Sequence, residues 1–200
     1  GHVSSDAVVA VTPQGEAVPR NRRQEETFRK VLLAGMEMLR ESSYADLTVR
    51  AVAARAKVAP ATAYTYFSSK NHLIAEVYLD LIRQAPFFTD VNDTRLSRVQ
   101  QALRSLALVI ADEPEVAVAC TTAVLSNDAG VHRVRDRIGA EIHKRIKSAL
   151  GPDADPQLVS ALEMTYYGAL VHAGSGTLTY RQVADRMSYV VGLILRDANS

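Results

Sequence analysis

Hydroxyl-bearing side chains are concentrated in one short segment of the sequence. Residues 48–70 read TVRAVAARAKVAPATAYTYFSSK. Hydroxyl groups, ammonium groups and the free N–H groups of a helix start all bind phosphate oxygens. No lysine or arginine lies between residues 60 and 67, so bidentate readout of guanine from this stretch is excluded. What remains is hydrogen bonding by hydroxyl groups and methyl contact with thymine, from Pro60, Ala61, Thr62, Tyr64, Thr65 and Tyr66.

Two short helices must position these groups. Thr48 can cap a helix start because its hydroxyl can accept a free backbone N–H, and Val49, Val52 and Ala53 continue as an apolar stripe at helical spacing. Pro60 disfavours the helical conformation in the residue before it and suits the first turn of a new helix. Two short helices joined by a tight turn outline a helix-turn-helix, whose second helix enters the DNA major groove.

The end of the second helix carries a specific pattern. From Thr62 the sequence reads TAYTYFSSK, and this run, with the TVRAVA segment that begins at Thr48, resembles the DNA-binding signature of TetR-family transcriptional regulators. With the helices before and after it, the resemblance covers roughly residues 24–85. It implies phosphate contact for Tyr64 and Lys70, a DNA-facing position for Thr62 and Thr65, and a core position for Phe67.

Two residues depart from the family pattern. Lys57 stands in the turn, where the family most often has glycine, and a residue other than glycine in a left-handed turn costs about 1 kcal/mol or more. Ala59 stands where the family often has a capping residue, so we expect a cap, and with it a phosphate contact, to be missing. For Tyr66 two interpretations stay open: a contact with DNA, or a core position with an exposed hydroxyl group.

Positive charge surrounds the same segment. Residues 20–70 contain ten lysines and arginines against five acidic residues, whereas residues 71–200 contain thirteen against fifteen. Phosphate binding needs this sign of charge, and its contribution falls with added salt. Arg22 and Arg23 belong to a basic arm before the first helix, which either lies along DNA or is a solvated tail. Arg50 either reaches the DNA backbone or a base edge, or is a solvated surface side chain.

The second helix has no cationic side chains, so any preference of the protein for a particular DNA sequence must come from other groups. We expect it to depend on Arg50, on the basic arm and on the shape of the DNA.

Apolar residues recur at helical spacing along the rest of the chain. A first helix is predicted over about residues 24–40, and a broad stripe predicts another over about residues 70–84, between the DNA-binding unit and a second core. No alternating run suggests a sheet, so the predicted fold class is all-α. We expect three parts: residues 1–19, a flexible arm or a leader left from expression; residues 20–70, a three-helix DNA-binding domain; and residues 71–200, a larger helical bundle.

Composition and motif content exclude several function classes. Apolar residues make up 48% of the chain, as in folded globular proteins, and no apolar run approaches the roughly 18 residues needed to cross a membrane. No secretory signal is visible and the single cysteine, Cys120, excludes an internal disulfide, so we expect a cytoplasmic protein. Phosphate-loop, dinucleotide-binding, metalloprotease and hydrolase motifs are absent. We therefore expect no catalytic residues, no metal and no cofactor.

The roles of the C-terminal bundle are implied by the resemblance alone. In this family it binds a small ligand between helices and dimerises through the last two long helices, here about residues 156–175 and 180–197. A pocket among apolar helices would take a mostly apolar ligand. The candidate ligand-binding residues, each of which could instead fill the core, are Phe87, Phe88, Leu103, Met164 and Tyr167. The candidate dimer-interface residues, open to the same alternative, are Leu158, Leu162, Met187, Val191 and Ile194.

Taken together, the resemblance implies a homodimeric regulator on a pseudo-palindromic operator in double-stranded DNA. Paired recognition helices must match half-sites about one helical turn apart, or a multiple of that. We expect a repressor that a small-molecule effector releases from its operator by a population shift. Two alternatives remain: an architectural or activator DNA-binding protein without an inducer, or a helical ligand carrier or enzyme with a vestigial helix-turn-helix.

Overall fold

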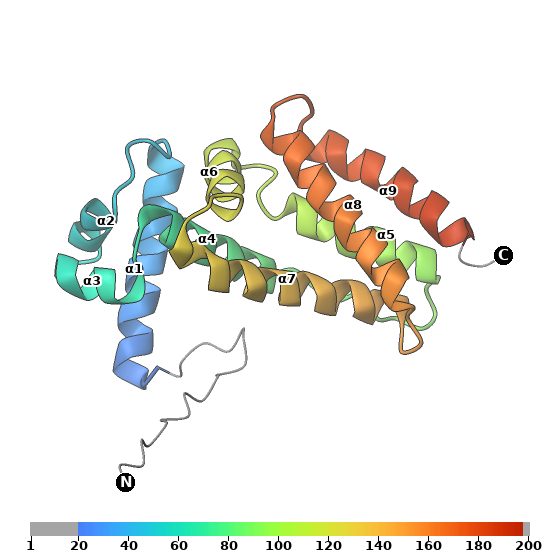
Figure 1. Cartoon of the computed structure of the whole chain (residues 1–200), viewed down its shortest axis with the longest axis horizontal. Helices are drawn as coiled ribbons and strands as arrows, with labels where there is room; N and C mark the ends of the chain where they lie inside the picture. Colours follow the sequence, from blue (N-terminus) through green and yellow to red (C-terminus); the bar gives the residue numbers. More distant parts are fainter. Residues whose placement is uncertain (1–19, 198–200) are drawn as a thin grey trace, which may run out of the picture.

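Helices are the regular structure of residues 20–197, the part of the chain that the computed structural model describes. Figure 1 shows α1, α2 and α3 at one end of the molecule, α8 and α9 at the other, and α4 and α7 running between them. The all-α fold class is confirmed, while the arm predicted over residues 1–19 lies outside the described residues. The helices are α1 (Arg22–Glu41), α2 (Val49–Arg55), α3 (Pro60–Tyr66), α4 (Lys70–Arg83), α5 (Arg95–Leu108), α6 (Pro114–Val124), α7 (Ala129–Leu150), α8 (Pro156–Gly174) and α9 (Tyr180–Asp197).

Helix α1 begins two residues earlier than predicted because it has a complete capping box. The Asn21 side chain accepts the backbone N–H of Gln24 at 2.8 Å, and the Gln24 side chain accepts the N–H of Asn21 at 3.0 Å. Arg22 and Arg23 therefore lie in the first turn of a helix. The prediction that these two arginines belong to an arm before the first helix was wrong.

The two short helices form as their local signals predicted. The Thr48 hydroxyl accepts the N–H of Ala51 at 3.0 Å and caps α2, and Pro60 opens α3. Ala59 provides no side-chain cap to α3, as expected. Lys57 has a φ of 56°, so a residue other than glycine occupies the left-handed turn between the helices.

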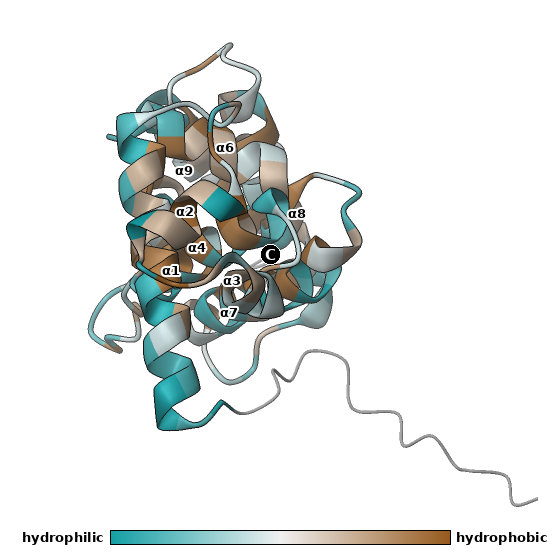
Figure 2. Ribbon diagram, turned by 90° about the vertical axis from the view of Figure 1, so that its left-hand side faces the viewer, coloured by the Kyte–Doolittle hydropathy of each residue, from teal (hydrophilic) through white to brown (hydrophobic). Residues whose placement is uncertain are grey.

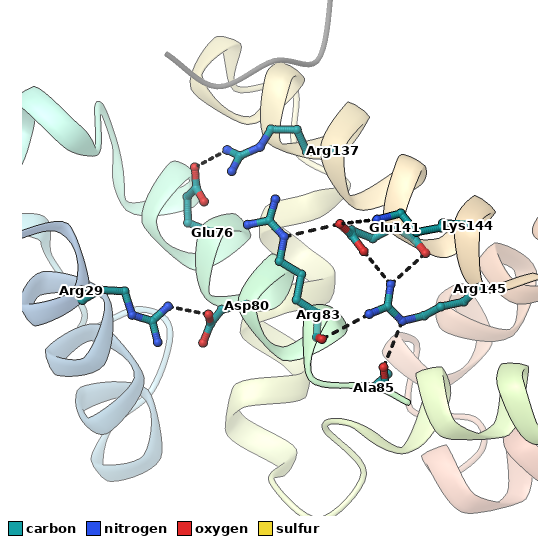
Figure 3. A network of polar contacts seen from close by, with 9 residues as sticks. All are labelled: Arg29, Glu76, Asp80, Arg83, Ala85, Arg137, Glu141, Lys144 and Arg145. Atoms are coloured by element: carbon teal, nitrogen blue, oxygen red, sulfur yellow. Dashed lines mark hydrogen bonds and ion pairs between the residues drawn. The ribbon is translucent and has the colours of Figure 1, made fainter. Parts of the chain in front are cut away.

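Helix α4 joins the helix-turn-helix to the C-terminal bundle. It packs against α1 on one side and against α6 and α7 on the other, which confirms the position predicted for this helix. Figure 3 shows the charged groups that hold it: Arg29 of α1 donates to Asp80 at 2.6 Å, and Arg137 of α7 donates to Glu76 at 3.0 Å. The division of the chain at residue 70 stays a prediction, because one continuous core runs along α4.

The C-terminal end of α4 is fixed by a buried cation. Arg145 of α7 is only 3% exposed, and its guanidinium donates to the carbonyls of Arg83 and Ala85 at 3.2 Å and to Glu141 at 2.6 Å (Figure 3). A cation at this position is favoured by the helix dipole. Burial raises the pKa of Glu141, but the hydrogen bond from Arg145 and the charges of Lys144, Arg145 and Arg83 outweigh it and lower the pKa.

Replacing Glu76 by glutamine is expected to destabilise the fold by about 3 kcal/mol or more, because the Arg137 guanidinium would stay buried without a counter-charge. Burial raises the pKa of Glu76, but its contacts with His72 and Arg137 outweigh burial and lower the pKa below 4.5. An acid with a depressed pKa contributes stability above its unfolded-state pKa and loses it as the pH falls through the folded-state value. The difference between Glu76→Gln and wild type should therefore shrink below pH 4.5.

Urea unfolding from neutral pH to below 4.5 measures this effect. Glu26→Gln is the control, since Glu26 forms a 3.4 Å ion pair with Arg22 on the open surface of α1 and its loss should change stability little. Equal effects of the two substitutions would contradict a structural role for the buried pair.

Replacing Lys57 by glycine is expected to stabilise the fold. Relief of the left-handed backbone should exceed the entropic cost of a glycine, for a net gain of about 0.5–1 kcal/mol. Ala54→Gly is the matched control, because the same residue type placed in α2 should cost about 1 kcal/mol. Thermal unfolding of both variants tests the prediction, and it is wrong if Lys57→Gly lowers the melting temperature.

Candidate nucleic-acid interface

Helix α3 has one buried face and one open face. Ala63 and Phe67 are buried, and the Phe67 ring stacks on Phe28 of α1 with 5.0 Å between ring centroids. The Tyr64 side chain is 49% exposed. The other exposed residues of the helix are Pro60, Ala61, Thr62 and Thr65. Five of the six residues predicted to supply hydrogen bonds and methyl contacts thus share one solvent-facing surface.

The sixth residue, Tyr66, is placed differently. It is partly buried, and its ring meets Phe28 edge-on with 6.3 Å between centroids. This geometry favours the interpretation of Tyr66 as a core residue. Thr65 also has a local partner, because its hydroxyl donates to the Ala61 carbonyl at 3.0 Å. Toward the solvent Thr65 therefore offers its oxygen lone pairs and its methyl group.

Lys70 holds the loop between α1 and α2. Its ammonium group donates to the Tyr44 carbonyl at 2.9 Å and lies 4.1 Å from the centroid of the Tyr44 ring. The Tyr44 hydroxyl in turn donates to Asn71. An ammonium group has three N–H bonds. The hydrogen bond to the Tyr44 carbonyl uses one of them and leaves two for another acceptor.

Two cationic side chains of the helix-turn-helix are exposed to solvent. Arg50 in α2 and Lys57 in the turn are exposed, and neither forms an ion pair with another described residue. Arg55, by contrast, is neutralised by Glu41 at 2.6 Å. Lys57 was not among the predicted site residues, although its charge in the turn was a visible signal.

The basic residues at the start of α1 are partly engaged. The Arg20 guanidinium lies 3.7 Å from the centroid of the Phe28 ring and donates to Glu25 at 2.8 Å. Arg22 pairs with Glu26 at 3.4 Å, and Arg23 is exposed in the same first turn. In Figure 2, which looks onto the end of the molecule with α1, α2 and α3, this part of α1 forms a hydrophilic strip.

The structure does not bring the predicted ligand-binding residues together. Leu103 is buried and Phe88 partly buried, whereas Met164 is 72% exposed. The Phe87 ring is exposed and carries the Arg145 guanidinium 4.5 Å from its centroid. Tyr167 is the member of the set that lines a cavity.

That cavity lies among α4, α6 and α8 and is small. Its volume is about 20 Å³, enough for roughly one water molecule. The Tyr78 and Tyr166 hydroxyls form a buried hydrogen bond of 2.5 Å beside it. Burial raises the pKa of Tyr78, Tyr166 and Cys120, so all three stay protonated at neutral pH. The lining residues are Tyr78, Cys120, Thr121, Val124, Leu125, Tyr167, Leu170 and Val171.

Most of the predicted dimer-interface residues face into their own subunit. Leu162, Met187 and Val191 are buried in the chain's core, and Leu158 and Ile194 are partly buried against it. Apolar periodicity shows that a helix has an apolar face, but not whether that face packs into its own subunit or against a partner. Helix α8 has two apolar faces. The large apolar side chains that α8 and α9 expose are instead Met164, Val171, Tyr189, Val190 and Leu193.

Residues 20–197 contain neither a candidate metal cluster nor a candidate membrane-spanning helix. No cluster of three or more histidine, cysteine, aspartate or glutamate side chains there could hold a metal ion. None of the helices in that range is both long and apolar enough to cross a membrane.

Comparisons with known proteins agree with this geometry. Residues 31–77 match the family model of bacterial regulatory proteins of the tetR family. The chain is 66% identical to an uncharacterized HTH-type transcriptional regulator of Mycobacterium tuberculosis strain H37Rv, over 98% of this chain and 96% of the relative. It is 27% identical to the HTH-type transcriptional repressor KstR of Rhodococcus jostii strain RHA1, over 98% of this chain and 95% of the relative.

A solved structure shares the whole fold. The crystal structure of a TetR transcriptional regulator from Rhodococcus sp. RHA1 superposes with a TM-score of 0.76 at 19% sequence identity, over 88% of this chain and 98% of that chain. With the family match and the identity of 66% over nearly the full length, the chain belongs to the TetR family of transcriptional regulators.

Proposed function

We propose that this protein is a homodimeric repressor that binds a pseudo-palindromic DNA operator and is released by a small, mostly apolar effector. The observation that carries the proposal is the open face of α3, where exposed hydroxyl and methyl groups stand on a helix anchored by buried Ala63 and Phe67. Repression is supported by the similarity to KstR, which is named a transcriptional repressor.

In this proposal α3 enters the major groove and the groups around it bind the DNA backbone. Tyr64, the two free N–H bonds of Lys70 and the capped start of α2 at Thr48 contact phosphates. Arg50 and Lys57 add positive charge next to the groove. Arg22 and Arg23 extend the charged surface along the first turn of α1. Thr62, Thr65, Ala61 and Pro60 contact base edges, with Tyr66 supporting the helix from below.

The dimer is proposed to form through α8 and α9. These two helices expose the apolar side chains Met164, Val171, Tyr189, Val190 and Leu193. Val190 also lines a surface hollow of about 300 Å³ between the two helices. A two-fold axis on this face would cover the same surface in both copies and would leave both helix-turn-helix units free at the far end of the molecule (Figure 1).

Release is proposed to start at the cavity beside Tyr78 and Tyr167. With about 20 Å³ it is too small for an effector, so a ligand would stabilise a form in which α6 and α8 have separated. Because α4 lines the same cavity through Tyr78 and continues into the helix-turn-helix, this opening would change the position of the recognition helix.

Selection of duplexes from a random library by the purified protein, together with genomic footprinting, tests the proposal. We expect enrichment of an inverted repeat whose half-sites lie about one helical turn apart, with an affinity that falls steeply with salt. Absence of any enriched sequence would overturn it.

Tyr64→Phe is expected to weaken binding to the selected operator and to a scrambled duplex by similar factors, about tenfold, because a phosphate contact positions the protein without specifying sequence. Lys57→Gln should reduce the slope of log K against log salt by about 0.9. Gel-shift titrations measure both effects. Thr122→Val, which removes an exposed hydroxyl group on α6, is the control, and a Tyr64→Phe loss confined to the operator would contradict the assignment.

Met164→Glu is expected to weaken dimerisation about a hundredfold or more, because it places like charges near a two-fold axis in an apolar interface. Met164 is 72% exposed within the subunit, so the monomer fold should survive. Val91→Glu is the control, since Val91 is 88% exposed in the loop between α4 and α5. Sedimentation velocity distinguishes the forms, and a Met164→Glu protein that stays dimeric would exclude this face.

A further inference from the structure

The C-terminal end of the recognition helix is held by a histidine from the next helix. The backbone N–H of Ser68 donates to Nδ1 of His72 at 3.0 Å, and the Ser68 hydroxyl lies 3.2 Å from the same nitrogen. The His72 ring also meets the ring of Phe67 edge-on, with 5.8 Å between centroids. The imidazole thus contacts the two residues that follow α3 directly.

The opposite side of the same ring is connected to α7. Its Nε2 atom lies 3.7 Å from a carboxylate oxygen of Glu76, and that oxygen accepts a hydrogen bond from Arg137 at 3.0 Å. Glu76 is 6% exposed, so this is a buried charge pair (Figure 3). A continuous polar chain therefore runs from Arg137 through Glu76 and His72 to Ser68.

The first turn of α7 is also seated against Ser68. A Cβ atom added to Gly130 would lie 2.3 Å from the Ser68 hydroxyl oxygen and 3.3 Å from Cβ of His72. The backbone of α7 therefore approaches the end of the recognition helix as closely as a glycine allows. Any movement of α7 along this contact must displace Ser68 or open a gap beside it.

We infer that His72 is a positioning residue, which sets the recognition helix against α7 and thereby sets the affinity for DNA. This rests on the proposed DNA-binding function and adds a regulatory route to it. A backbone amide can only donate, so Nδ1 must be unprotonated, and the neutral ring carries its proton on Nε2, toward Glu76.

Charged groups of α4 and α7 lie near the ring. Glu76 faces it from α4, Arg137 stands behind Glu76 on α7, and Asp128 caps the turn of α7 that contains Gly130, with its carboxylate accepting the Gly130 N–H at 2.8 Å. The Glu76 carboxylate favours the tautomer with the proton on Nε2, which leaves Nδ1 to accept the Ser68 N–H.

Two substitutions distinguish the role of Nδ1 from that of Nε2. In His72→Asn the amide oxygen can replace Nδ1 and accept the Ser68 N–H, whereas in His72→Gln the longer amide lies closer to the position of Nε2 and leaves that N–H unpaired. The probe is the operator duplex recovered by the selection experiment, with dissociation constants measured by fluorescence anisotropy at constant salt. At neutral pH we expect His72→Asn to bind within about threefold of wild type and His72→Gln to bind about tenfold more weakly. Equal affinities of the two variants would overturn the inference.

A second pair of variants keeps the test valid if His72→Gln fails to fold. Gly130→Ala should push against Ser68 and weaken DNA binding, whereas Gly139→Ala on the same helix should not, because its added Cβ would lie 3.7 Å from its nearest neighbour, the Tyr167 hydroxyl. Unchanged binding by Gly130→Ala would count against the inference. If wild-type protein selects no duplex, the proposed function fails; if it does and these variants behave alike, only the role of His72 fails.

Discussion

The C-terminal end of α4 is held by one buried cation, the guanidinium group of Arg145. A charge taken out of water is costly unless its hydrogen bonds are replaced, and here the carbonyls of Arg83 and Ala85 and the carboxylate of Glu141 replace them. Two of these acceptors lie where α4 ends, so satisfying the charge also fixes the helix end. The middle of α4 is bound to α7 through Glu76 and Arg137. The helix-turn-helix is thus attached to a pair of helices that are joined at two points along α4.

Local signals predicted the helix-turn-helix well because its structure is decided over a few residues. The Thr48 cap and the start of α3 at Pro60 each involve neighbours within one turn. The positive φ at Lys57 was expected only from the family resemblance, because the family most often has glycine at this position. Asn21 and Gln24 carry an equally local capping-box signal, and reading it would have placed Arg22 inside the helix rather than in an arm.

The C-terminal bundle could be predicted only in outline, because its details depend on contacts between distant residues. Apolar periodicity located α8, but both Leu162 and Met164 belong to apolar faces, and only packing against the rest of the chain decides that the first is buried and the second exposed. The hydrogen bond between Lys70 and the Tyr44 carbonyl joins residues 26 positions apart, so no local sequence pattern predicts it. Closure of the cavity beside Tyr167 likewise depends on side chains from three helices.

The small volume of the cavity has a consequence for how a repressor of this kind would sense its effector. Under the proposed release mechanism, a ligand binds only the opened form, so its apparent dissociation constant equals the intrinsic one divided by the fraction of molecules that are open. The effector concentration at which repression ends is then set by the packing of α6 against α8 as much as by contacts with the ligand. The buried hydrogen bond between Tyr78 and Tyr166 adds a chemical filter, since a pure hydrocarbon that separated these hydroxyls would leave them unpaired, whereas a ligand with one well-placed polar group would not.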